Sequence, residues 1–311
     1  MGTDLPQVSD DQAGFLSQLL DRGLLLACGV PGIYGHSAEF EDVRAALEAL
    51  LTREAVVRGA ERLRFPPLLP RHELESSGYL ASFPHLAGTV YAFEGGEAAA
   101  QEQYERASRH EPWDEFQRMT DLALMPAACY PVYPAIAART PLPAEGVFVE
   151  AGGAWVFRRE PSMDPARRQM FRQHELVRIG APDDVKQWRE EWAAHGLALL
   201  RGLGLTAELD TANDPFFGRR GRLLARSQRD QALKHEIVAP IAGPAPTALV
   251  SFNAHHDHFT ATYAITLEGG CLAHSACVGF GHERIVLALL RKHGLAPAQW
   301  PAEVRERLQL P

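Results

Sequence analysis

The 311-residue sequence has little of several features that would narrow its function at once. It contains four cysteines at wide spacings, which gives no disulfide framework and fits a reducing cytoplasm. The apolar stretch at residues 24–30 is too short to span a membrane. The first residues lack the basic and apolar regions of a signal peptide. A net charge of −8 argues against a nucleic-acid-binding surface spread over the whole chain.

What the sequence does contain is enough apolar material for a full core, since 46% of its residues are hydrophobic. No internal repeat or low-complexity tract interrupts it. Apolar periodicity and turn residues give a coarse secondary structure. Helices are predicted at 12–27, 38–62, 97–110 and 183–200, and strands at 89–93, 206–209 and 247–267.

Residues 154–180 are predicted to form a hairpin, in which an apolar strand leads through a loop with proline and aspartate into a second strand. Period-2 spacing predicts that Val156, Arg158 and Glu160 share one face of the first strand. The arginine suits a phosphate, which it can bind bidentately, and the carboxylate suits an exocyclic amine. A charged surface hairpin is the ordinary alternative for such a stretch.

A second stretch, residues 277–290, strengthens the ligand-binding interpretation. Gly279 and Gly281 are expected to form a turn into an apolar helix that carries Arg284 in its first turn, where an anion is favoured. A Gly-x-Gly pattern alone is weak, but together with the hairpin it resembles motifs 2 and 3 of class II aminoacyl-tRNA synthetases. The resemblance implies an α+β fold, with an antiparallel β-sheet flanked by helices, that activates amino acids with ATP.

Further motifs extend the resemblance over nearly the whole chain. The sequence is similar to amino acid:[carrier protein] ligases, truncated homologues of the atypical, methanogen-type seryl-tRNA synthetase core. The motifs are Gly-Ile-Tyr-Gly at 32–35, Pro-Ala-Ala-Cys-Tyr-Pro-Val-Tyr-Pro at 126–134, Phe-Arg-Arg-Glu-Pro-Ser-Met-Asp-Pro-Ala-Arg at 157–167, Asn-Asp-Pro-Phe-Phe-Gly at 213–218, Ser-Phe-Asn-Ala-His-His-Asp-His-Phe at 251–259 and Ala-His-Ser-Ala-Cys-Val-Gly-Phe-Gly-His-Glu-Arg at 273–284. Arg168, Gln173 and His174 depart from the expected pattern. We expect one catalytic domain over residues 1–311, without a tRNA-binding domain.

A metal site is implied by the resemblance and not by spacing. Cys129, Glu175 and Cys277 are scattered in the sequence, and a buried thiol is the ordinary role of such cysteines. In the ligases that the chain resembles, a Cys–Glu–Cys set binds Zn²⁺. Three protein ligands leave a fourth position, which the amino group of the substrate can occupy.

The remaining cysteines and a histidine cluster are given other roles. Cys28 and Cys271 have no partner in the metal scheme and are expected to be core or structural thiols. His255, His256 and His258 resemble a second metal site. Alternation along a strand separates their side chains onto opposite faces, which favours hydrogen-bonding roles.

The resemblance also implies the nucleotide site. Arg158 would hold the α-phosphate as a catalytic residue, and Glu160 would bind the adenine amine. Arg167 and Arg284 would clamp the γ-phosphate, with Arg168 in the same loop and Mg²⁺ accompanying ATP. The other side of the nucleotide would be lined by Lys234, Ala248, Leu249, Val250 and Ser251, and the amino-acid pocket by Glu175, Asp214 and Phe216.

The implied reaction has two steps. A small amino acid, glycine or alanine, and ATP would give an aminoacyl-adenylate, and the aminoacyl group would pass to the phosphopantetheine thiol of a carrier protein. Two alternatives are a tRNA-aminoacylating enzyme and a non-catalytic synthetase paralogue that acts as a regulatory or binding subunit. The acidic charge and the lack of a tRNA-binding arm count against the first. The retained Arg158, Glu160 and Arg284 count against the second.

A basic helical insertion is predicted at about residues 219–236. Between 219 and 234, six basic side chains stand against one acidic side chain. A solvated helix face is the ordinary interpretation, but the charge is of one sign and would steer a small acidic carrier protein. The arginines expected to contact that partner are Arg219, Arg220, Arg222, Arg226 and Arg229. By family expectation the protein is a homodimer.

Overall fold

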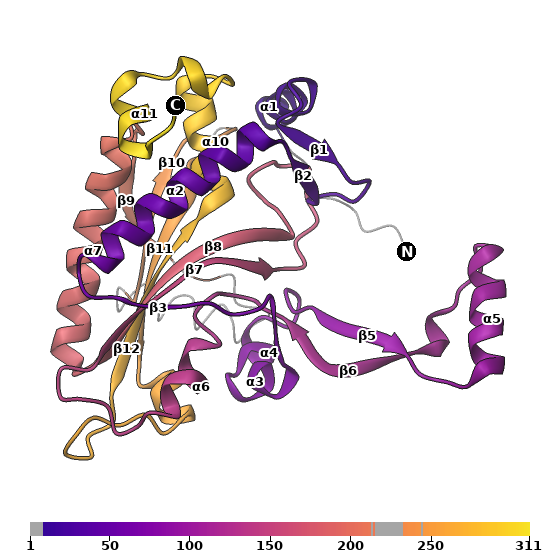
Figure 1. Cartoon of the computed structure of the whole chain (residues 1–311), viewed down its shortest axis with the longest axis horizontal. Helices are drawn as coiled ribbons and strands as arrows, with labels where there is room; N and C mark the ends of the chain where they lie inside the picture. The colour runs from indigo at the N-terminus through magenta and orange to yellow at the C-terminus, as the bar shows by residue number, and fades with distance from the viewer. Residues whose placement is uncertain (1–8, 213, 215–232, 244) are drawn as a thin grey trace.

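The computed structural model describes residues 9–212, 214, 233–243 and 245–311 (Figure 1). Several predicted functional residues therefore lie outside the described residues. They are Phe216, Arg219, Arg220, Arg222, Arg226 and Arg229.

A seven-stranded sheet forms the centre of the molecule, in the order β3-β7-β8-β12-β11-β10-β9. Only β3 runs parallel to its neighbour, and the other pairs are antiparallel, as expected. The long hairpin of β7 and β8 confirms the predicted one. The strands are β3 (Glu61–Leu63), β7 (Val147–Phe157), β8 (Met170–Gly180), β9 (Glu208–Thr211), β10 (Lys234–Ala239), β11 (Thr247–His256) and β12 (His274–Gly281).

Long helices cover one face of this sheet (Figure 1). They are α2 (Ala38–Val56), α7 (Pro182–Gly202) and α10 (His282–His293), joined by α1 (Asp10–Asp21), the turn η2 (Pro297–Gln299) and α11 (Ala302–Leu308). The Ser37 side chain caps α2 by accepting from the backbone of Phe40, and Pro182 begins α7 at a position that needs no N–H donor. Their apolar stripes and the sheet form the largest core, around Leu47, Trp192 and Phe252.

Shorter helices cover part of the opposite face and leave room for a cavity. They are α6 (Val132–Ala137) and α9 (His258–Thr262). Tyr133 of α6 stacks on Phe259 of α9 with ring centroids 4.2 Å apart, and both pack on Val149 and Val177 of the sheet. None of the helices in the described part of the chain combines the length and apolar character needed to span a bilayer.

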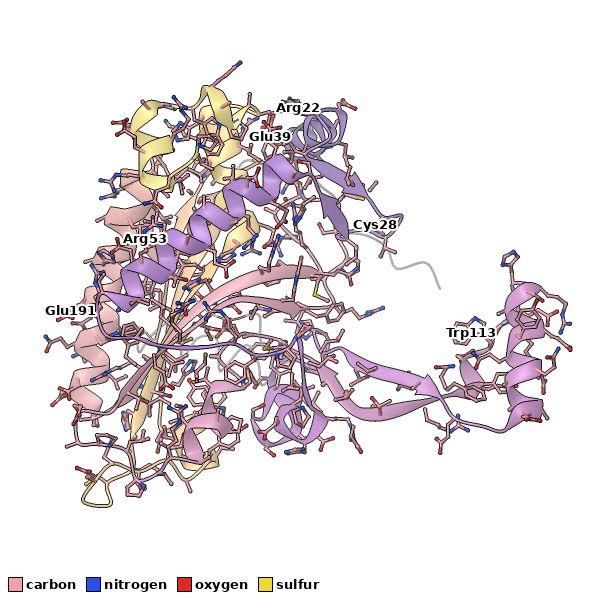
Figure 2. All side chains as sticks on the ribbon, in the orientation of Figure 1. Arg22, Cys28, Glu39, Arg53, Trp113 and Glu191 are labelled. Carbon is pink, nitrogen blue, oxygen red and sulfur yellow. The ribbon has the colours of Figure 1, made fainter. Side chains whose placement is uncertain are left out.

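A second, three-stranded sheet carries an arm that projects from the body (Figure 1). Its elements are β4 (Leu68–Pro70), α3 (Arg71–Ser76), α4 (Tyr79–Ser82), β5 (Thr89–Phe93), α5 (Glu97–Ser108), the turn η1 (Asp114–Phe116) and β6 (Gln117–Leu124). The predicted strand at 89–93 and helix at 97–110 are confirmed. Helix α5 buries none of its residues, and Trp113 beside it is exposed (Figure 2).

Several predicted element boundaries were wrong. The helix expected at 12–27 ends at Asp21, because Gly23 adopts a φ of 70° and the chain turns into β1 (Leu25–Ala27), which pairs with β2 (Tyr34–His36). The strand expected at 247–267 ends at His256, where a register shift and a φ of 50° direct the chain into α9.

Two further expectations about residue environment were also wrong. Cys28 and Cys271 are exposed and belong to no core cluster. Lys234 and Glu236, which were placed in the basic helical insertion, lie on strand β10. Their side chains alternate with those of His235 and Ile237, so Lys234 and Glu236 share one face of the sheet.

Candidate active site and metal centre

A cavity of about 500 Å³ lies on the face of the seven-stranded sheet that α6 and α9 leave partly open. Strands β8, β11 and β12 form its floor, and the loop between β7 and β8 forms one wall. Most of the predicted site residues line it: Cys129, Arg158, Glu160, Arg168, Glu175, Asp214, Lys234, Ala248, Leu249, Val250, Ser251, Cys277 and Arg284.

Cys129, Glu175 and Cys277 meet at one end of this cavity, although they are far apart in the sequence. Their thiol and carboxylate atoms all lie within 4.8 Å of one another, and all three residues are buried. The backbone N–H of Cys129 donates to Glu175 Oε2 at 2.8 Å, which ties the loop before α6 to strand β8. Cys277 lies on β12 two residues from Gly279, the pairing partner of Glu175.

The three groups favour their neutral forms when nothing else is bound. Burial raises the pKa of Glu175. For Cys277, the hydrogen bond with Cys129 and burial both raise the pKa well above its ordinary value. The hydrogen bond from Cys277 lowers the pKa of Cys129, but burial and the Glu175 carboxylate together raise it further than that bond lowers it. Two thiols and a carboxylate are the donor set of a tetrahedral zinc site with one open position, and a bound cation would reverse these shifts.

The surroundings of the trio are polar and sterically open. His255 Nε2 lies 3.2 Å from Cys277 Sγ, and Asn253 Nδ2 lies 3.5 Å from it, so the hydrogen-bonding role expected for His255 is confirmed. Gly279 was expected in a turn but lies within β12. A Cβ there would come within 2.7 Å of Gln173 Nε2, so glycine keeps the floor of the cavity open beside Glu175.

Arg158 and Arg284 both line the cavity. Arg284 donates from Nε to the carbonyl of Ala166 at 2.8 Å and from Nη1 to that of Ala248 at 3.0 Å. Burial, followed by the nearby positive charge of Arg158, lowers the pKa of Arg284. Two arginines that repel one another across a cavity form a site where a polyanion is stabilised.

Arg158 and Glu160 do not share a strand face as expected. Strand β7 ends at Phe157, and only the bond from Arg158 N to Gln169 O, at 2.9 Å, continues the pairing. Glu160 lies in the loop and forms an ion pair with Arg167 Nη1 at 2.6 Å. Arg167 does not line the cavity in this arrangement, so it reaches the site through Glu160.

Lys234 lies opposite these arginines with carboxylates on both sides. Its Nζ is 2.6 Å from Asp214 Oδ1 and 3.0 Å from Glu236 Oε1. Sequence reasoning missed Glu236, Gln173 and Asn253 as cavity-lining residues. Alternation on β10 from Lys234 would have found Glu236, and alternation on β8 from Glu175 would have found Gln173.

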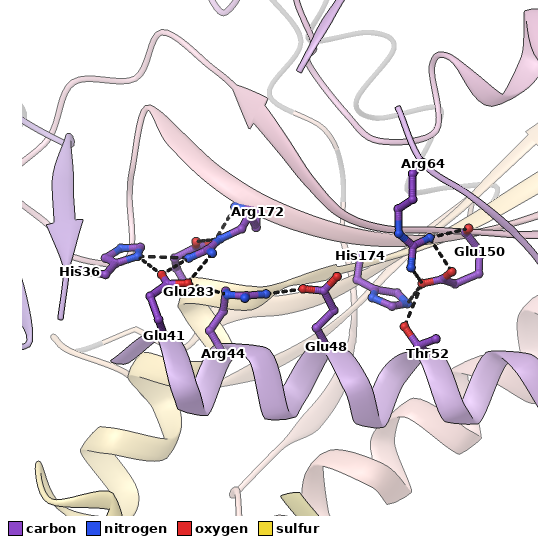
Figure 3. Close-up of polar contacts among 10 residues, drawn as sticks. All are labelled: His36, Glu41, Arg44, Glu48, Thr52, Arg64, Glu150, Arg172, His174 and Glu283. Atoms are coloured by element: carbon purple, nitrogen blue, oxygen red, sulfur yellow. Dashed lines mark hydrogen bonds and ion pairs between the residues drawn. The ribbon is translucent and has the colours of Figure 1, made fainter. Parts of the chain in front are cut away.

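The other face of β8 carries a buried polar network (Figure 3). Arg172 donates to Glu283 Oε1 at 3.0 Å and to Glu41 Oε2 at 2.6 Å. Further along, Glu150 accepts from Arg64 Nη1 at 2.7 Å and lies 3.0 Å from His174. The network joins α2, β7, β8 and α10 beneath the arginine end of the cavity.

Comparison with known proteins identifies this arrangement. No family model matches the chain. Amino acid--[acyl-carrier-protein] ligase 1 of Bradyrhizobium diazoefficiens is 44% identical over 308 residues, which cover 98% of this chain and 92% of that protein. The chain belongs to the amino acid--[acyl-carrier-protein] ligase family. The predicted resemblance is thereby confirmed, and this member of the ligase family carries the cavity described above.

More distant relatives confirm the fold of the ligase. The type-2 serine--tRNA ligase of Methanopyrus kandleri is 26% identical over 298 residues, which cover 88% of this chain and 55% of that protein. The chain therefore spans about half the length of that relative. The structure of M. kandleri SerRS in complex with A. aeolicus tRNASec superposes with a TM-score of 0.81 at 22% identity, over 99% of this chain and 62% of that one. The predicted class II aminoacyl-tRNA synthetase fold is confirmed.

Proposed function

We propose that this ligase activates a small amino acid, glycine or alanine, with ATP and transfers it to the phosphopantetheine thiol of a carrier protein. A carboxylate oxygen of the amino acid attacks the α-phosphorus, and pyrophosphate leaves. The thiolate of the carrier then attacks the carbonyl carbon, and AMP leaves. The observation that carries the proposal is one cavity that is lined both by two thiols and a carboxylate and by arginines.

The arginine end supports the nucleotide roles. Arg158 and Arg284 are fixed by carbonyl acceptors and lie on two walls, where they would hold the α- and γ-phosphates without reorganisation. Glu160 and Arg167 form a pair that ATP would separate, with the carboxylate turning to the adenine amine and the guanidinium to the γ-phosphate. Lys234 and residues 248–251 would line the opposite side, and Mg²⁺ would accompany the phosphates.

The other end supports zinc and the amino-acid pocket. The trio of Cys129, Glu175 and Cys277 would hold Zn²⁺, which when bound orients the amino group of the substrate through its open position. Asp214 lies near this end, because its charge acts on His255, whose Nε2 is 3.2 Å from Cys277 Sγ.

The carrier protein and a second copy of the chain are the proposed macromolecular partners. The basic segment at 219–229 lies outside the described residues, but Asp214 before it and Leu233 after it both line the cavity. This supports docking of an acidic carrier close to the site. A homodimer is supported by the arm, where Tyr91, Trp113 and Met119 are exposed.

The deciding experiment is amino-acid-dependent pyrophosphate–ATP exchange with each of the twenty amino acids, followed by thioester formation on a phosphopantetheinylated carrier. Exchange with glycine or alanine and transfer to the carrier are expected. No exchange with any amino acid would support a non-catalytic synthetase paralogue. Transfer to tRNA in place of the carrier would support a tRNA-aminoacylating enzyme. Sedimentation of the full chain tests the dimer.

A further inference from the structure

Arg168 occupies an unusual environment for a charged side chain. It is only 4% exposed, and its guanidinium lies between the rings of Tyr34 and Phe40, at 5.6 and 5.5 Å from their centroids. Among the described residues no carboxylate forms an ion pair with it, and its Nη2 has no hydrogen-bond partner. The side chain lines the nucleotide cavity, so a buried cation without an ion-pair partner among the described residues borders the place where phosphates are proposed to bind.

The remaining donors of Arg168 are fixed from two directions. Its Nε donates to the carbonyl of Pro165 at 3.0 Å, within its own loop. Its Nη1 lies 2.5 Å from Nε2 of His36, which belongs to strand β2, remote in sequence from the loop. Among the residues that the structure describes, His36 is therefore the one hydrogen-bond partner of this guanidinium from outside the β7–β8 loop.

The protonation state of His36 follows from its partners. A guanidinium can only donate, so His36 Nε2 must accept and the ring proton must be on Nδ1. There Glu41 Oε1, at 2.6 Å, accepts it, and Arg172 Nη2, which lies 3.1 Å from Nδ1, donates to that same carboxylate oxygen. A second proton on Nε2 would face the Arg168 donor directly, so only the neutral ring with this tautomer fits the arrangement.

We propose that His36 is a positioning residue for the ATP site: its unprotonated Nε2 holds the buried Arg168 guanidinium in place at the wall where the phosphates are proposed to bind. The proposal rests on the proposed function, because it assumes that phosphates bind at the arginine end. Protonation of His36 removes the acceptor and releases Arg168, which links ATP affinity to pH.

The charged groups around His36 determine the pH at which its ring becomes protonated. They are Glu41 from α2, Arg172 from β8, Arg168 from the loop and Glu283 from α10. Burial and the Arg168 charge lower the pKa of His36, and the two carboxylates oppose this without reversing it. The ring is neutral at neutral pH, and the KM for ATP is expected to rise only at acid pH, below the ordinary pKa of histidine.

Two substitutions at His36 distinguish the effect of losing the hydrogen-bond acceptor from the effect of losing a group that titrates. His36→Leu removes the acceptor and is expected to raise the KM and Kd for ATP roughly tenfold, with kcat little changed, as for the loss of one hydrogen bond to a charged group. His36→Gln offers an uncharged amide oxygen and should keep the wild-type KM at pH 7.5, but without the rise at acid pH. His195→Gln is the matched control, because His195 also contacts a glutamate, Glu54, at 2.9 Å and does not line the cavity.

A double-variant cycle tests whether His36 acts through Arg168. In an Arg168→Met background, His36→Leu should have no further effect on ATP affinity. Equal ATP affinity in wild-type protein and His36→Leu, or an additive effect of the two substitutions, would overturn the proposal. Calorimetry of ATP binding distinguishes a failure of this proposal from a failure of the proposed function. If the wild-type protein binds ATP but catalyses no exchange, the proposed reaction is rejected. The role of His36 is rejected only by equal Kd values for ATP in wild-type protein and His36→Leu.

Discussion

The two faces of strand β8 differ in how their buried charged groups are paired. On one face, Arg172 is held between Glu41 and Glu283, and His174 contacts Glu150, so opposite charges meet in pairs. On the other face, Glu175 is grouped with two thiols that also ionise to anions. Alternate residues of β8 therefore belong to a network of oppositely charged pairs on one face and to a set of acidic groups on the other.

This difference indicates which face of β8 is suited to bind ligands. A buried charge with its counter-charge in place completes the fold and has no need of a ligand. Three buried acidic groups with raised pKa values are suited to a cation, which would favour their ionised forms, and arginines that repel one another are suited to an anion. The same reasoning distinguishes Arg172, which is paired, from Arg168, which is not.

The largest expected effect comes from removing one of the like groups. Cys277→Ala should cause near-complete loss of bound Zn²⁺ and of amino-acid-dependent exchange, because only two ligands remain. Elemental analysis and exchange measure this, and Cys271→Ala, an exposed cysteine away from the site, is the control. Retention of both metal and activity in Cys277→Ala would mean that this face of the sheet is not a metal centre.

The next largest effect is expected at the arginine end. Arg158→Ala should reduce exchange by roughly 10²–10³, the cost of losing one preorganised donor to developing charge, while the thermal transition stays unchanged. Arg159→Ala is the matched control, because the neighbouring Arg159 is exposed and does not line the cavity. An unchanged exchange rate in Arg158→Ala would place the nucleotide elsewhere.

On the face of β8 that carries the ion-pair network, a substitution is expected to reduce the stability of the fold. Burial raises the pKa of Glu150, but His174 and Arg64 outweigh this and hold it at about 2. A depressed pKa contributes stability above the unfolded value near 4.3, and that stability is lost as the pH falls toward 2. Glu150→Gln should therefore lower the free energy of unfolding by about 3 kcal/mol at pH 7, and the difference from wild type should shrink between about pH 4.5 and 2.

Chemical denaturation across that pH range measures this difference. Glu191→Gln, at an exposed position, is the control and should change the free energy of unfolding little. A constant difference between wild type and Glu150→Gln at every pH would show that the carboxylate does not titrate as a paired group.

The smallest expected effect concerns the segment at 219–229. Arg220→Glu with Arg226→Glu should leave exchange intact and slow transfer to the carrier roughly tenfold at low salt, because a one-signed charge steers the encounter. The difference should diminish as salt rises. Lys186→Glu with Lys292→Glu makes the same charge change at two other exposed positions. Transfer at the wild-type rate in the arginine double variant would show that this segment is not the docking surface.

Much of the site was predictable because it lies on regular elements. Periodicity located the β7–β8 hairpin, and the resemblance to a known family indicated Arg158, Glu175 and Cys277. The errors fell where a local conformation interrupts a pattern, as at Gly23 and His256, which adopt positive φ values. Apolar periodicity continues past both points and gives no sign that the chain turns. The single-domain prediction and the arginines of the basic segment stay predictions.

The sequence by itself determined the alternation of side chains along β8, and with it the separation of Arg172 and His174 from Gln173 and Glu175. It did not contain the distances between elements. Only the tertiary structure brought Cys129 and Cys277 to Glu175, ended β7 before Arg158, and placed His36 against Arg168. These outcomes depend on how the helices and loops pack on the two faces of the sheet, because a contact between residues remote in the chain is decided by the shared core and not by local pattern.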